Sequence, residues 1–254
     1  MAHDYSLFTS RIKDIMRLPR SGKLLKGDLL TETFLLHREK VSGKEMTIYY
    51  APFEYVNASA KVVLIGIAPN WTQMETAFRE VNRSLRAGLS IEEVLKRAGD
   101  RATFAGMTRT NLVKMLDGVG LAEELEIKSS GLLFDRASQL VHTTSAIRHP
   151  VFVNGSDYSG NWPDMTRHQV LRRYITDILA EELQSMPFAL IIPLGKAVSS
   201  AVGLLIDNGS LDSERCLQDF PHPSGANASR VREYERRKED YAATVRRWYR
   251  RWHA

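Results

Sequence analysis

The residues best suited to chemistry stand near the end of the sequence, in the run Phe220-Pro221-His222-Pro223-Ser224-Gly225-Ala226-Asn227. The prolines on either side of His222 restrict its backbone, and an imidazole N–H can stabilise negative charge that grows on a leaving group. The amides around Ser224 and Gly225 precede a basic helical segment and can meet a phosphate there. The run therefore predicts a hydrogen-bond donor beside a phosphate site; the alternative is a capping turn with a surface histidine.

A second polar turn, Ala68-Pro69-Asn70-Trp71, follows an apolar stretch at residues 62–67. The Asn70 amide can orient a water molecule or read a base edge, although asparagine is also a common turn residue. Trp71 can stack on a flat ligand or belong to the core. Asp157, in the run Asn154-Gly155-Ser156-Asp157-Tyr158, and Asn111 are further groups that could position water.

Apolar runs predict the elements that position these turns. Three buried strands are expected at residues 62–67, 139–144 and 188–192, with helices at 73–86, 91–97, 110–116, 167–184, 195–205 and 231–252. Strands that alternate with helices favour a parallel sheet covered on both faces. Ligands bind at the carboxyl ends of such strands. The turn after Ile67, the segment after Thr144 and the His222 loop should converge there.

Composition narrows the class of protein. The 254 residues suffice for one large α/β domain spanning 1–254, in which residues 1–60 form an extension with a helix at 4–18 and a hairpin around Ser42-Gly43-Lys44. The lone Cys216 excludes an intrachain disulfide, a thiolate-held zinc site and a four-cysteine cluster. No apolar stretch approaches the roughly 20 residues that span a bilayer, and residues 1–13 lack a secretory pattern. We expect a cytoplasmic protein without membrane contact, and the net charge of +5 fits an anionic partner.

Taken in this order, the motifs resemble those of the uracil-DNA glycosylase superfamily. Gly66-Ile67-Ala68-Pro69-Asn70 matches its Gly-x-x-Pro-x motif after a buried strand, and His222-Pro223-Ser224 matches its final motif. The family's helix after the first motif is resembled by Phe104-Ala105-Gly106 together with residues 116–121. The family's apolar strand that ends in Leu-Gly-Lys is resembled by residues 191–197. The resemblance implies a three-layer α/β/α fold with a central, mostly parallel four-stranded sheet. It also implies a monomeric, monofunctional DNA glycosylase without metal, iron–sulfur cluster or other cofactor, which hydrolyses the N-glycosidic bond of a flipped uracil or modified pyrimidine.

The resemblance also assigns roles to residues. His222 would stabilise the departing base, while Asn70 or Asp157, with Asn111 as a third candidate, would orient water. The base would be held by a set of pocket residues, namely Gly66, Ile67, Ala68, Pro69, Trp71 and Ser145, with Thr144 as an alternative reader to Ser145. The DNA phosphates would be bound by Ser224, Gly225, Asn227, Arg148 and Lys196.

Three positions depart from the family pattern. Ala68 stands where many members place an acid or asparagine that positions water, Asn70 replaces a tyrosine that blocks the pyrimidine 5-position, and Ser145 replaces a base-reading asparagine. A 5-modified cytosine, such as the glucosylated hydroxymethyl form of some phage DNA, is therefore an alternative substrate and would indicate antiviral defence. A non-catalytic nucleic-acid-binding module and a different α/β hydrolase are the other functions considered, although no Gly-x-Ser-x-Gly elbow is present.

The last predicted helix is rich in arginine. Between residues 232 and 240 the basic side chains alternate with acids, so we interpret that part as a solvated face with i,i+4 ion pairs. Residues 246–252 contain four arginines and no acid. That end could hold phosphates through its guanidinium groups.

Overall fold

The computed structural model describes residues 4–104 and 106–252, and the chain divides into two compact units. Unit 1 comprises Met1–Val56, Ala68–Thr103 and Ile147–Pro163, and unit 2 comprises Asn57–Ile67, Phe104–Ala146 and Asp164–Ala254. Ala105 of the predicted Phe104-Ala105-Gly106 motif lies outside the described residues. The single domain expected over 1–254 stays a prediction.

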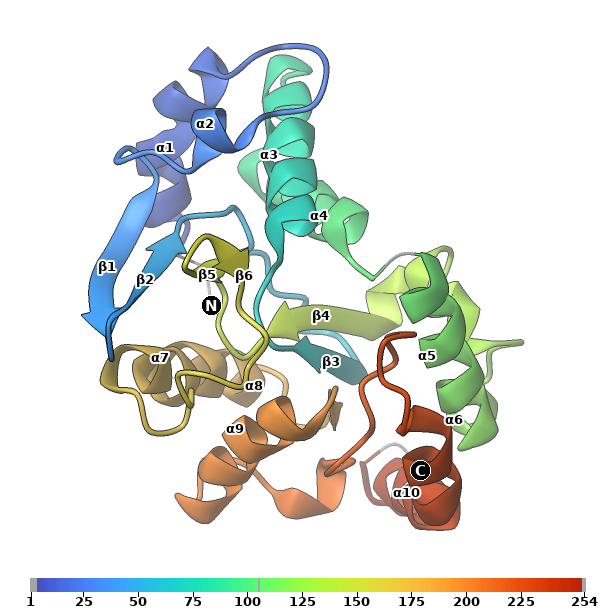
Figure 1. Ribbon diagram of the computed structural model, residues 1–254. Coiled ribbons are helices and arrows are strands. Elements are labelled where there is room, and N and C mark those ends of the chain that lie inside the picture. The colour runs from blue at the N-terminus through green and yellow to red at the C-terminus, as the bar shows by residue number, and fades with distance from the viewer. Residues whose placement is uncertain (1–3, 105, 253–254) are drawn as a thin grey trace. The chain divides into compact units, whose positions relative to one another are not determined.

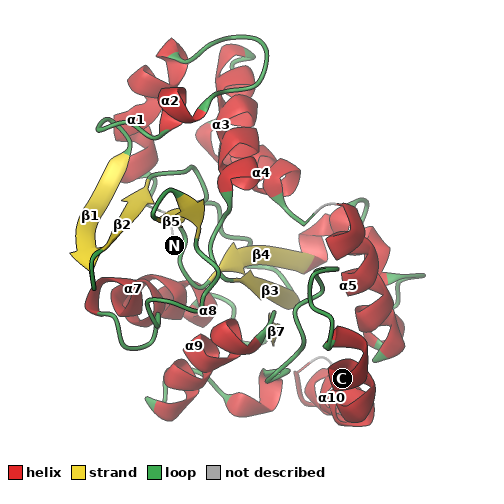
Figure 2. Ribbon diagram, viewed as in Figure 1, coloured by secondary structure: helices red, strands yellow, loops and turns green. Residues whose placement is uncertain are grey.

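Unit 1 combines helices with an antiparallel sheet. Its elements are α1 (Ser6–Arg17), α2 (Lys26–Leu29), β1 (Leu35–Val41), β2 (Lys44–Tyr49), α3 (Trp71–Arg86), α4 (Ile91–Ala102), β5 (Val151–Val153) and β6 (Ser156–Asp157). The strands pair in the order β1-β2-β5-β6, each antiparallel to its neighbour (Figure 2). The expected N-terminal helix and hairpin are confirmed, but the hairpin is only half of the sheet.

The second half of that sheet contains Asp157, in a strand that was not expected from the sequence. Asn154 and Gly155 both have positive φ, at 48° and 74°, which is the backbone of a two-residue hairpin turn favoured by Asn-Gly. The turn folds β6 back on β5, so Asp157 pairs with Phe152 in a strand. The Asn-Gly pair is the sequence signal that predicts this hairpin.

The core of unit 1 forms between the helices and β2. On α3, Met74, Ala77, Phe78 and Val81 are fully buried, and their spacing of three or four residues places them along one helix face. The ring of Phe78 meets that of Phe34 edge to face, with centroids 4.9 Å apart. This packing fixes the direction in which α3 leaves the turn after Pro69.

Unit 2 is built on a parallel sheet. Its strands are β3 (Val62–Gly66), β4 (Val141–Ser145) and β7 (Leu190–Pro193), paired in the order β4-β3-β7. Its helical elements are α5 (Gly106–Gly118), α6 (Leu121–Glu124), η1 (Ser130–Phe134), η2 (Ser138–Leu140), α7 (Gln169–Arg173), the π-helical η3 (Tyr174–Leu179), α8 (Ala180–Gln184), α9 (Lys196–Asp207), η4 (Ser213–Arg215) and α10 (Arg230–Trp252). The mixed α/β class and the parallel strands are confirmed.

The sheet has three strands, as the sequence patterns predicted, where the resemblance to the glycosylase superfamily implied four. Beside β7, a fourth parallel segment contributes a single bridge, between Ile191 and Cys216, and Leu217 donates its amide to the Ile191 carbonyl at 2.9 Å. This segment is short: η4 precedes it, and Phe220, which follows it, is fully buried in the core. The predicted fourth strand is thus reduced to one bridge.

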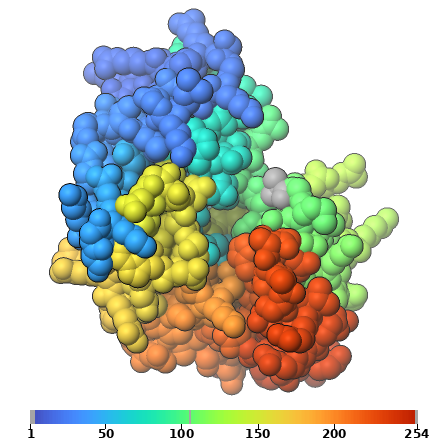
Figure 3. All heavy atoms as spheres, viewed as in Figure 1, coloured from blue at the N-terminus to red at the C-terminus, as the bar shows by residue number. Residues whose placement is uncertain are grey.

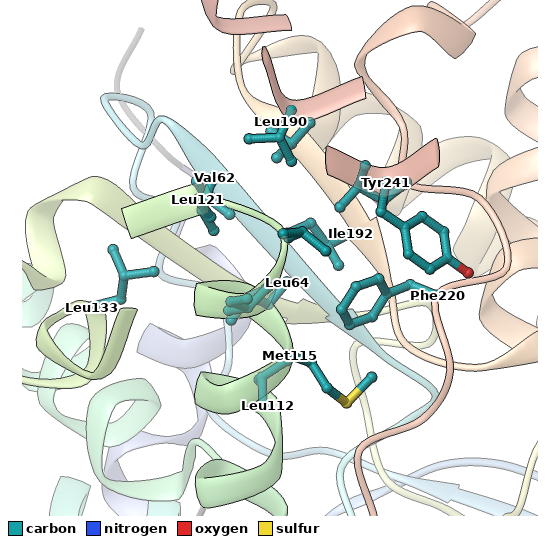
Figure 4. Close-up of a cluster of buried hydrophobic side chains, with 14 of the residues drawn as sticks. Val62, Leu64, Leu112, Met115, Leu121, Leu133, Leu190, Ile192, Phe220 and Tyr241 are labelled. Atoms are coloured by element: carbon teal, nitrogen blue, oxygen red, sulfur yellow. The ribbon is translucent and has the colours of Figure 1, made fainter. Parts of the chain in front are cut away.

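Helices cover both faces of this sheet (Figure 1). Successive strand residues point to opposite faces, and Val62, Leu64, Leu190 and Ile192 pack in a cluster with side chains of α5, α6 and α10 (Figure 4). On the opposite face, His142 of β4 bonds through Nε2 to the Glu182 carboxylate of α8, at 2.7 Å. The two helical layers hold the strands rigidly and leave their carboxyl ends for the loops.

Candidate active site

The carboxyl end of β3 in unit 2 is bordered by polar and aromatic groups. Gly66 pairs with Ser145 in the parallel ladder. A β-carbon built on Gly66 would lie 3.6 Å from Ser145 Oγ and 3.9 Å from the edge of the Phe104 ring. Within the described part of the chain, the Ser145 hydroxyl has no hydrogen-bond partner. The Ser145 hydroxyl and the Phe104 ring therefore both lie beside the backbone of Gly66, which carries no side chain.

His222 stands just beyond the carboxyl end of β7 and packs against Gly195. A β-carbon on Gly195 would lie 3.1 Å from the His222 Cβ, and Gly195 has φ 95° and ψ 165°, a conformation almost confined to glycine. The Gly195 amide also donates to the carbonyl of Phe220 at 2.8 Å. Because adjacent strands lie about 5 Å apart, this places His222 in the same row of strand ends as Gly66 and Ser145.

The chain that leads into the His222 loop is anchored in the core. Phe220 is fully buried, and its ring contacts those of Tyr234 and Tyr241, with centroids 6.1 and 5.2 Å away. The Tyr241 hydroxyl donates to the carbonyl of Asp219 at 2.7 Å, and the Asp219 amide donates to Ser199 Oγ at 2.9 Å. Both contacts fix the backbone immediately before the histidine.

The hydrogen bonds of His222 define its protonation. Its Nδ1 accepts from the Ser224 amide at 3.2 Å, so the proton of the neutral ring is carried by Nε2. Burial lowers the pKa of His222 below its usual 6.5, and the ring is neutral at pH 7. His222 consequently offers one N–H donor, at Nε2.

The loop after His222 is held by two side chains from other elements. Asn111 of α5 donates through Nδ2 to the Pro223 carbonyl at 2.9 Å, and Arg230 donates to the Ser224 carbonyl at 2.6 Å. A carbonyl only accepts, so this contact sets the orientation of the Asn111 amide and turns Oδ1 away from Pro223. Among the described residues its Oδ1 has no hydrogen-bond partner, so Asn111 brings a free oxygen acceptor to the His222 loop.

The predicted phosphate ligands of unit 2 lie around the same loop. Ser224 Oγ accepts from the Ala226 amide at 3.2 Å, and Asn227 Nδ2 donates to the His222 carbonyl at 3.3 Å. Gly225 is exposed at the tip. Lys196, at the start of α9, is highly exposed and pairs with Glu233 at 3.6 Å. The structure therefore groups Gly66, Ile67, Ser145, Lys196, His222, Ser224, Gly225 and Asn227 in unit 2.

The remaining predicted site residues lie in unit 1, where two of them cap a helix. Asn70 Oδ1 accepts from the Gln73 amide at 2.9 Å, while Gln73 Oε1 accepts from the Asn70 amide at 3.1 Å. Asp157 Oδ1 accepts from the Trp71 amide at 2.8 Å. Both polar groups proposed to orient water satisfy free amides at the N-terminus of α3. The helix begins two residues earlier than predicted, which is why sequence reasoning missed the cap.

The other unit 1 candidates differ in exposure. Pro69 is buried, whereas Ala68 and Trp71 are half-buried. Arg148 is half-buried, and its positive charge acts on both Glu54 and His149. His149 is buried against the Tyr50 ring, and burial lowers its pKa to about 3. Arg148 therefore faces the interior charges of unit 1, and its predicted phosphate contact stays a prediction.

Glu54 is a titratable group that sequence reasoning missed. The residue is 6% exposed, and burial raises its pKa to about 7 despite the nearby Arg148 and the Tyr50 hydroxyl. Buried carboxyls with raised pKa are typical of functional sites and of strained structural ones. The sequence feature that could have indicated a buried acid is the position of Glu54 within the aromatic-rich segment Tyr49-Tyr50-Ala51-Pro52-Phe53-Glu54-Tyr55.

The raised pKa of Glu54 predicts that stability falls as pH rises. Between pH 4.5 and about 7 the folded carboxyl keeps a proton that the unfolded one has lost, so the free energy of unfolding decreases through this window. A rise from 4.5 to about 7 corresponds to roughly 3 kcal/mol. Urea unfolding at pH 5 and pH 8 should show that Glu54→Gln removes this loss, whereas Glu45→Gln, on the exposed part of β2, keeps it. An equal pH dependence in wild type and Glu54→Gln would contradict the prediction.

Comparison with known proteins places the chain in a family. It is 39% identical over 231 residues to YoxB of Bacillus subtilis (strain 168), an alignment that covers 90% of this chain and 88% of the relative. The chain belongs to the YoxB family. The relative is described as an uncharacterized protein, so membership of the YoxB family brings no activity with it. No family model matches the chain, and no solved structure matches it.

Two surveys of the described residues add to the description of this YoxB family member. Among residues 4–104 and 106–252, no helix is long and apolar enough to cross a membrane. In the same ranges, no group of three or more histidine, cysteine or acidic side chains is arranged to hold a metal ion. Cys216 is buried, which raises the pKa of its thiol to about 12 and makes it a poor nucleophile.

Proposed function

We propose that this protein is a monofunctional DNA glycosylase of the uracil-DNA glycosylase-like fold, acting on a flipped uracil or modified pyrimidine. The observation that carries the proposal is the neutral His222, whose Nε2–H lies at the carboxyl ends of a parallel sheet on a His-Pro-Ser loop. The two motif loops that resemble the superfamily both follow strands of this sheet or of its bridged edge. No cofactor is proposed.

In the proposed reaction, His222 stabilises the departing base. The bond between C1′ of the sugar and the base nitrogen breaks, and its electron pair leaves with the base. The Nε2–H donates to a pyrimidine carbonyl oxygen, where the negative charge grows. Water forms the new bond at C1′, and the proton that it loses passes through solvent to the nitrogen of the departed base, so the products are the free base and an abasic site.

Ser145 and Phe104 are suited to recognise the flipped base. The Phe104 ring can stack on a flat heterocycle, and the adjacent Ser145 hydroxyl can both donate and accept a hydrogen bond. Gly66 lies beside both, and a β-carbon there would already be in ordinary contact with them, so the missing side chain leaves the space of one methyl group. A hydroxyl reads a base edge less strictly than an amide does, which supports testing modified cytosines as well as uracil.

Asn111 is our choice for the group that positions water. Of the three predicted candidates, Asn70 and Asp157 cap α3, whereas Asn111 contacts the His222 loop directly. Its Oδ1 can accept a hydrogen bond from the attacking water. The amide does so without taking the proton, which suits a reaction whose transition state carries its positive charge on the sugar.

The proposal is tested by incubating the protein with matched duplexes and then heating them in alkali. The duplexes carry uracil, a thymine mismatch, hydroxymethylcytosine or its glucosylated form. Strand cleavage on any of them, lost in His222→Ala, supports the glycosylase. Cleavage of the glucosylated duplex alone would favour a role in phage defence. Tight binding without cleavage of any duplex would instead support a non-catalytic nucleic-acid-binding module.

Substitution of Asn111 separates a water-positioning role from a scaffolding role. Asn111→Ala should lower kcat by roughly 10- to 100-fold, while Asn111→Asp should keep at least wild-type kcat because a carboxylate also accepts from water. Asn111→Asp loses the Nδ2 donor to Pro223, so a purely scaffolding role would impair both variants equally. Single-turnover kinetics measure the effect, and Asn208→Ala at the end of α9 serves as the asparagine control.

A further inference from the structure

The outward face of α10 changes character along the helix. All its acidic residues lie between Glu233 and Asp240. Beyond Asp240 the exposed positions carry Arg246, Arg247, Arg250 and Arg251. Arg251 pairs with acids of the turn at η4, and we call the other three the distal arginine face. At 100° per residue these three side chains point away from the buried stripe that includes Tyr241 and Trp248. The C-terminal segment that contains α10 reaches the surface in the space-filling view (Figure 3, red).

The backbone under this face is fixed by the core. Val245 and Trp248 are fully buried, and Trp248 Nε1 donates to the carbonyl of Phe188 at 2.8 Å. Arg251 forms ion pairs with Glu214 and Asp212 of the turn at η4. The helix end is therefore held at two places, and the distal arginine face projects from a preorganised support.

The charges on this face are not neutralised. Within the described residues, Arg246 and Arg250 have no acidic partner, and Arg247 bonds only to the Thr244 hydroxyl, at 3.2 Å. Arg237, in the first half of the helix, by contrast pairs with Asp219 at 2.6 Å. Planar guanidinium groups bind phosphate oxygens in pairs. An array of uncompensated arginines on a rigid helix fits a polyphosphate backbone.

We propose that the distal arginine face binds the phosphate backbone of duplex DNA outside the nucleotides held at the His222 loop. The choice of DNA rests on the proposed function. The helix begins at Arg230, which contacts that loop, and a rise of 1.5 Å per residue places Arg246 and Arg250 about 24 to 30 Å along it. Duplex DNA rises 3.4 Å per base pair, so the contacted phosphates lie up to about nine base pairs from the target.

A membrane surface fits this face less well. Helices that bind bilayers bury large apolar side chains beside their basic ones. Here the aromatic residues of the helix end point inward: Trp248 is fully buried, and Tyr249 and Trp252 pack against the core cluster. Just before these arginines, the half-buried positions 243 and 244 hold only the small residues Ala243 and Thr244. The distal arginine face therefore carries positive charge but no large apolar side chain that could insert into a bilayer.

Two double variants with the same charge change test the proposal. Arg246→Gln/Arg250→Gln alters the distal arginine face, and Arg232→Gln/Arg236→Gln removes two arginines with the same spacing from the acid-rich half. The full chain is titrated into a 30-base-pair duplex by fluorescence anisotropy at several salt concentrations. The distal variant should lower the slope of log affinity against log salt by about two, since each phosphate contact contributes about 0.9, and the control variant should leave it near the wild-type value.

Equal slopes in both variants would overturn the proposal, because binding would then depend on total charge. Preference of wild type for phosphatidylserine vesicles over DNA would overturn it in favour of a membrane surface. Base release distinguishes its failure from that of the proposed function. If wild type releases a base and the distal variant binds and acts like wild type on the long duplex, this proposal alone fails. If no base is released but the distal variant alone loses salt-dependent binding, only the glycosylase assignment fails.

Discussion

Replacing His222 with alanine is expected to reduce kcat for base release by roughly 100- to 1,000-fold, the usual effect of removing one donor to a developing negative charge. The donor is Nε2, because Nδ1 is occupied by the Ser224 amide. The loss should fall on kcat more than on duplex affinity, since the hydrogen bond strengthens only as the base departs. Single-turnover rates and anisotropy titrations measure the two quantities separately.

The pH profile adds an independent test of the His222 role. Burial lowers its pKa below 6.5, so the neutral ring is present throughout the range above that value. The rate should therefore show no inflection from this imidazole between pH 6.5 and 8. A rate that falls as His222 loses a proton within that range would indicate that the imidazolium is the active form.

Two variants make the His222 test specific. His222→Gln keeps an N–H donor on a side chain of similar reach and should recover part of the lost rate. His37→Ala, on β1 of unit 1, removes a histidine that pairs with Glu39 and should act like wild type. If His222→Ala released base at the wild-type rate, the proposed chemistry would be wrong.

The parts of the fold that follow from local patterns could be predicted. Residues 62–67 are apolar without interruption, and such a run in a short segment indicates a buried strand, which the structure confirms as β3. The same holds for β7. The strand β4 carries His142 and Thr143 and is not an apolar run, and the long helices follow from their amphipathic spacing. The His222 loop was found because its prolines and small residues stand together in the sequence.

The parts that depend on contacts between distant residues could not be predicted. Asn70 is interpreted as a water-positioning group because it is the polar residue next to the proline of the motif, and the helix is expected to start only at residue 73. Tertiary packing starts it at Trp71, where Asp157 from β6 supplies a second cap. The role of Asn111 depends likewise on a hydrogen bond to Pro223, 112 residues away. A residue's neighbours along the chain do not reveal such partners.

The raised pKa of Glu54 illustrates the same limit in energetic terms. Its shift is due to burial, which outweighs the opposing effects of the Tyr50 hydroxyl after β2 and of Arg148 after β4. The sequence shows an acid among aromatic residues, but only the fold shows that water is excluded from it. The charges of α10 show the same limit, because Glu233 pairs with Lys196 and Arg237 pairs with Asp219 of other segments. Among the described residues, the i,i+4 ion pairs expected between residues 232 and 240 do not form.

Replacing Gly195 with alanine is the second large effect that we expect. Gly195 has φ 95° and ψ 165°, a region essentially confined to glycine, so a side chain costs roughly 1 to 3 kcal/mol in strain. The new β-carbon would also lie 3.1 Å from the His222 Cβ and push the imidazole away. Displacement of a catalytic group by about 1 Å can cost on the order of 100-fold in rate, and we expect a kcat loss approaching that value.

A matched substitution on the same helix isolates this effect. Gly203 lies within α9, and a β-carbon there would meet nothing within 4 Å. Gly203→Ala should raise the free energy of unfolding by about 0.5 to 1 kcal/mol, as expected for a helix interior, and leave kcat unchanged. Urea unfolding and single-turnover base release measure both quantities. If Gly195→Ala kept wild-type kcat, close packing of His222 on Gly195 would have no part in placing the imidazole, and His222 would owe its position to the Ser224 and Phe220 contacts alone.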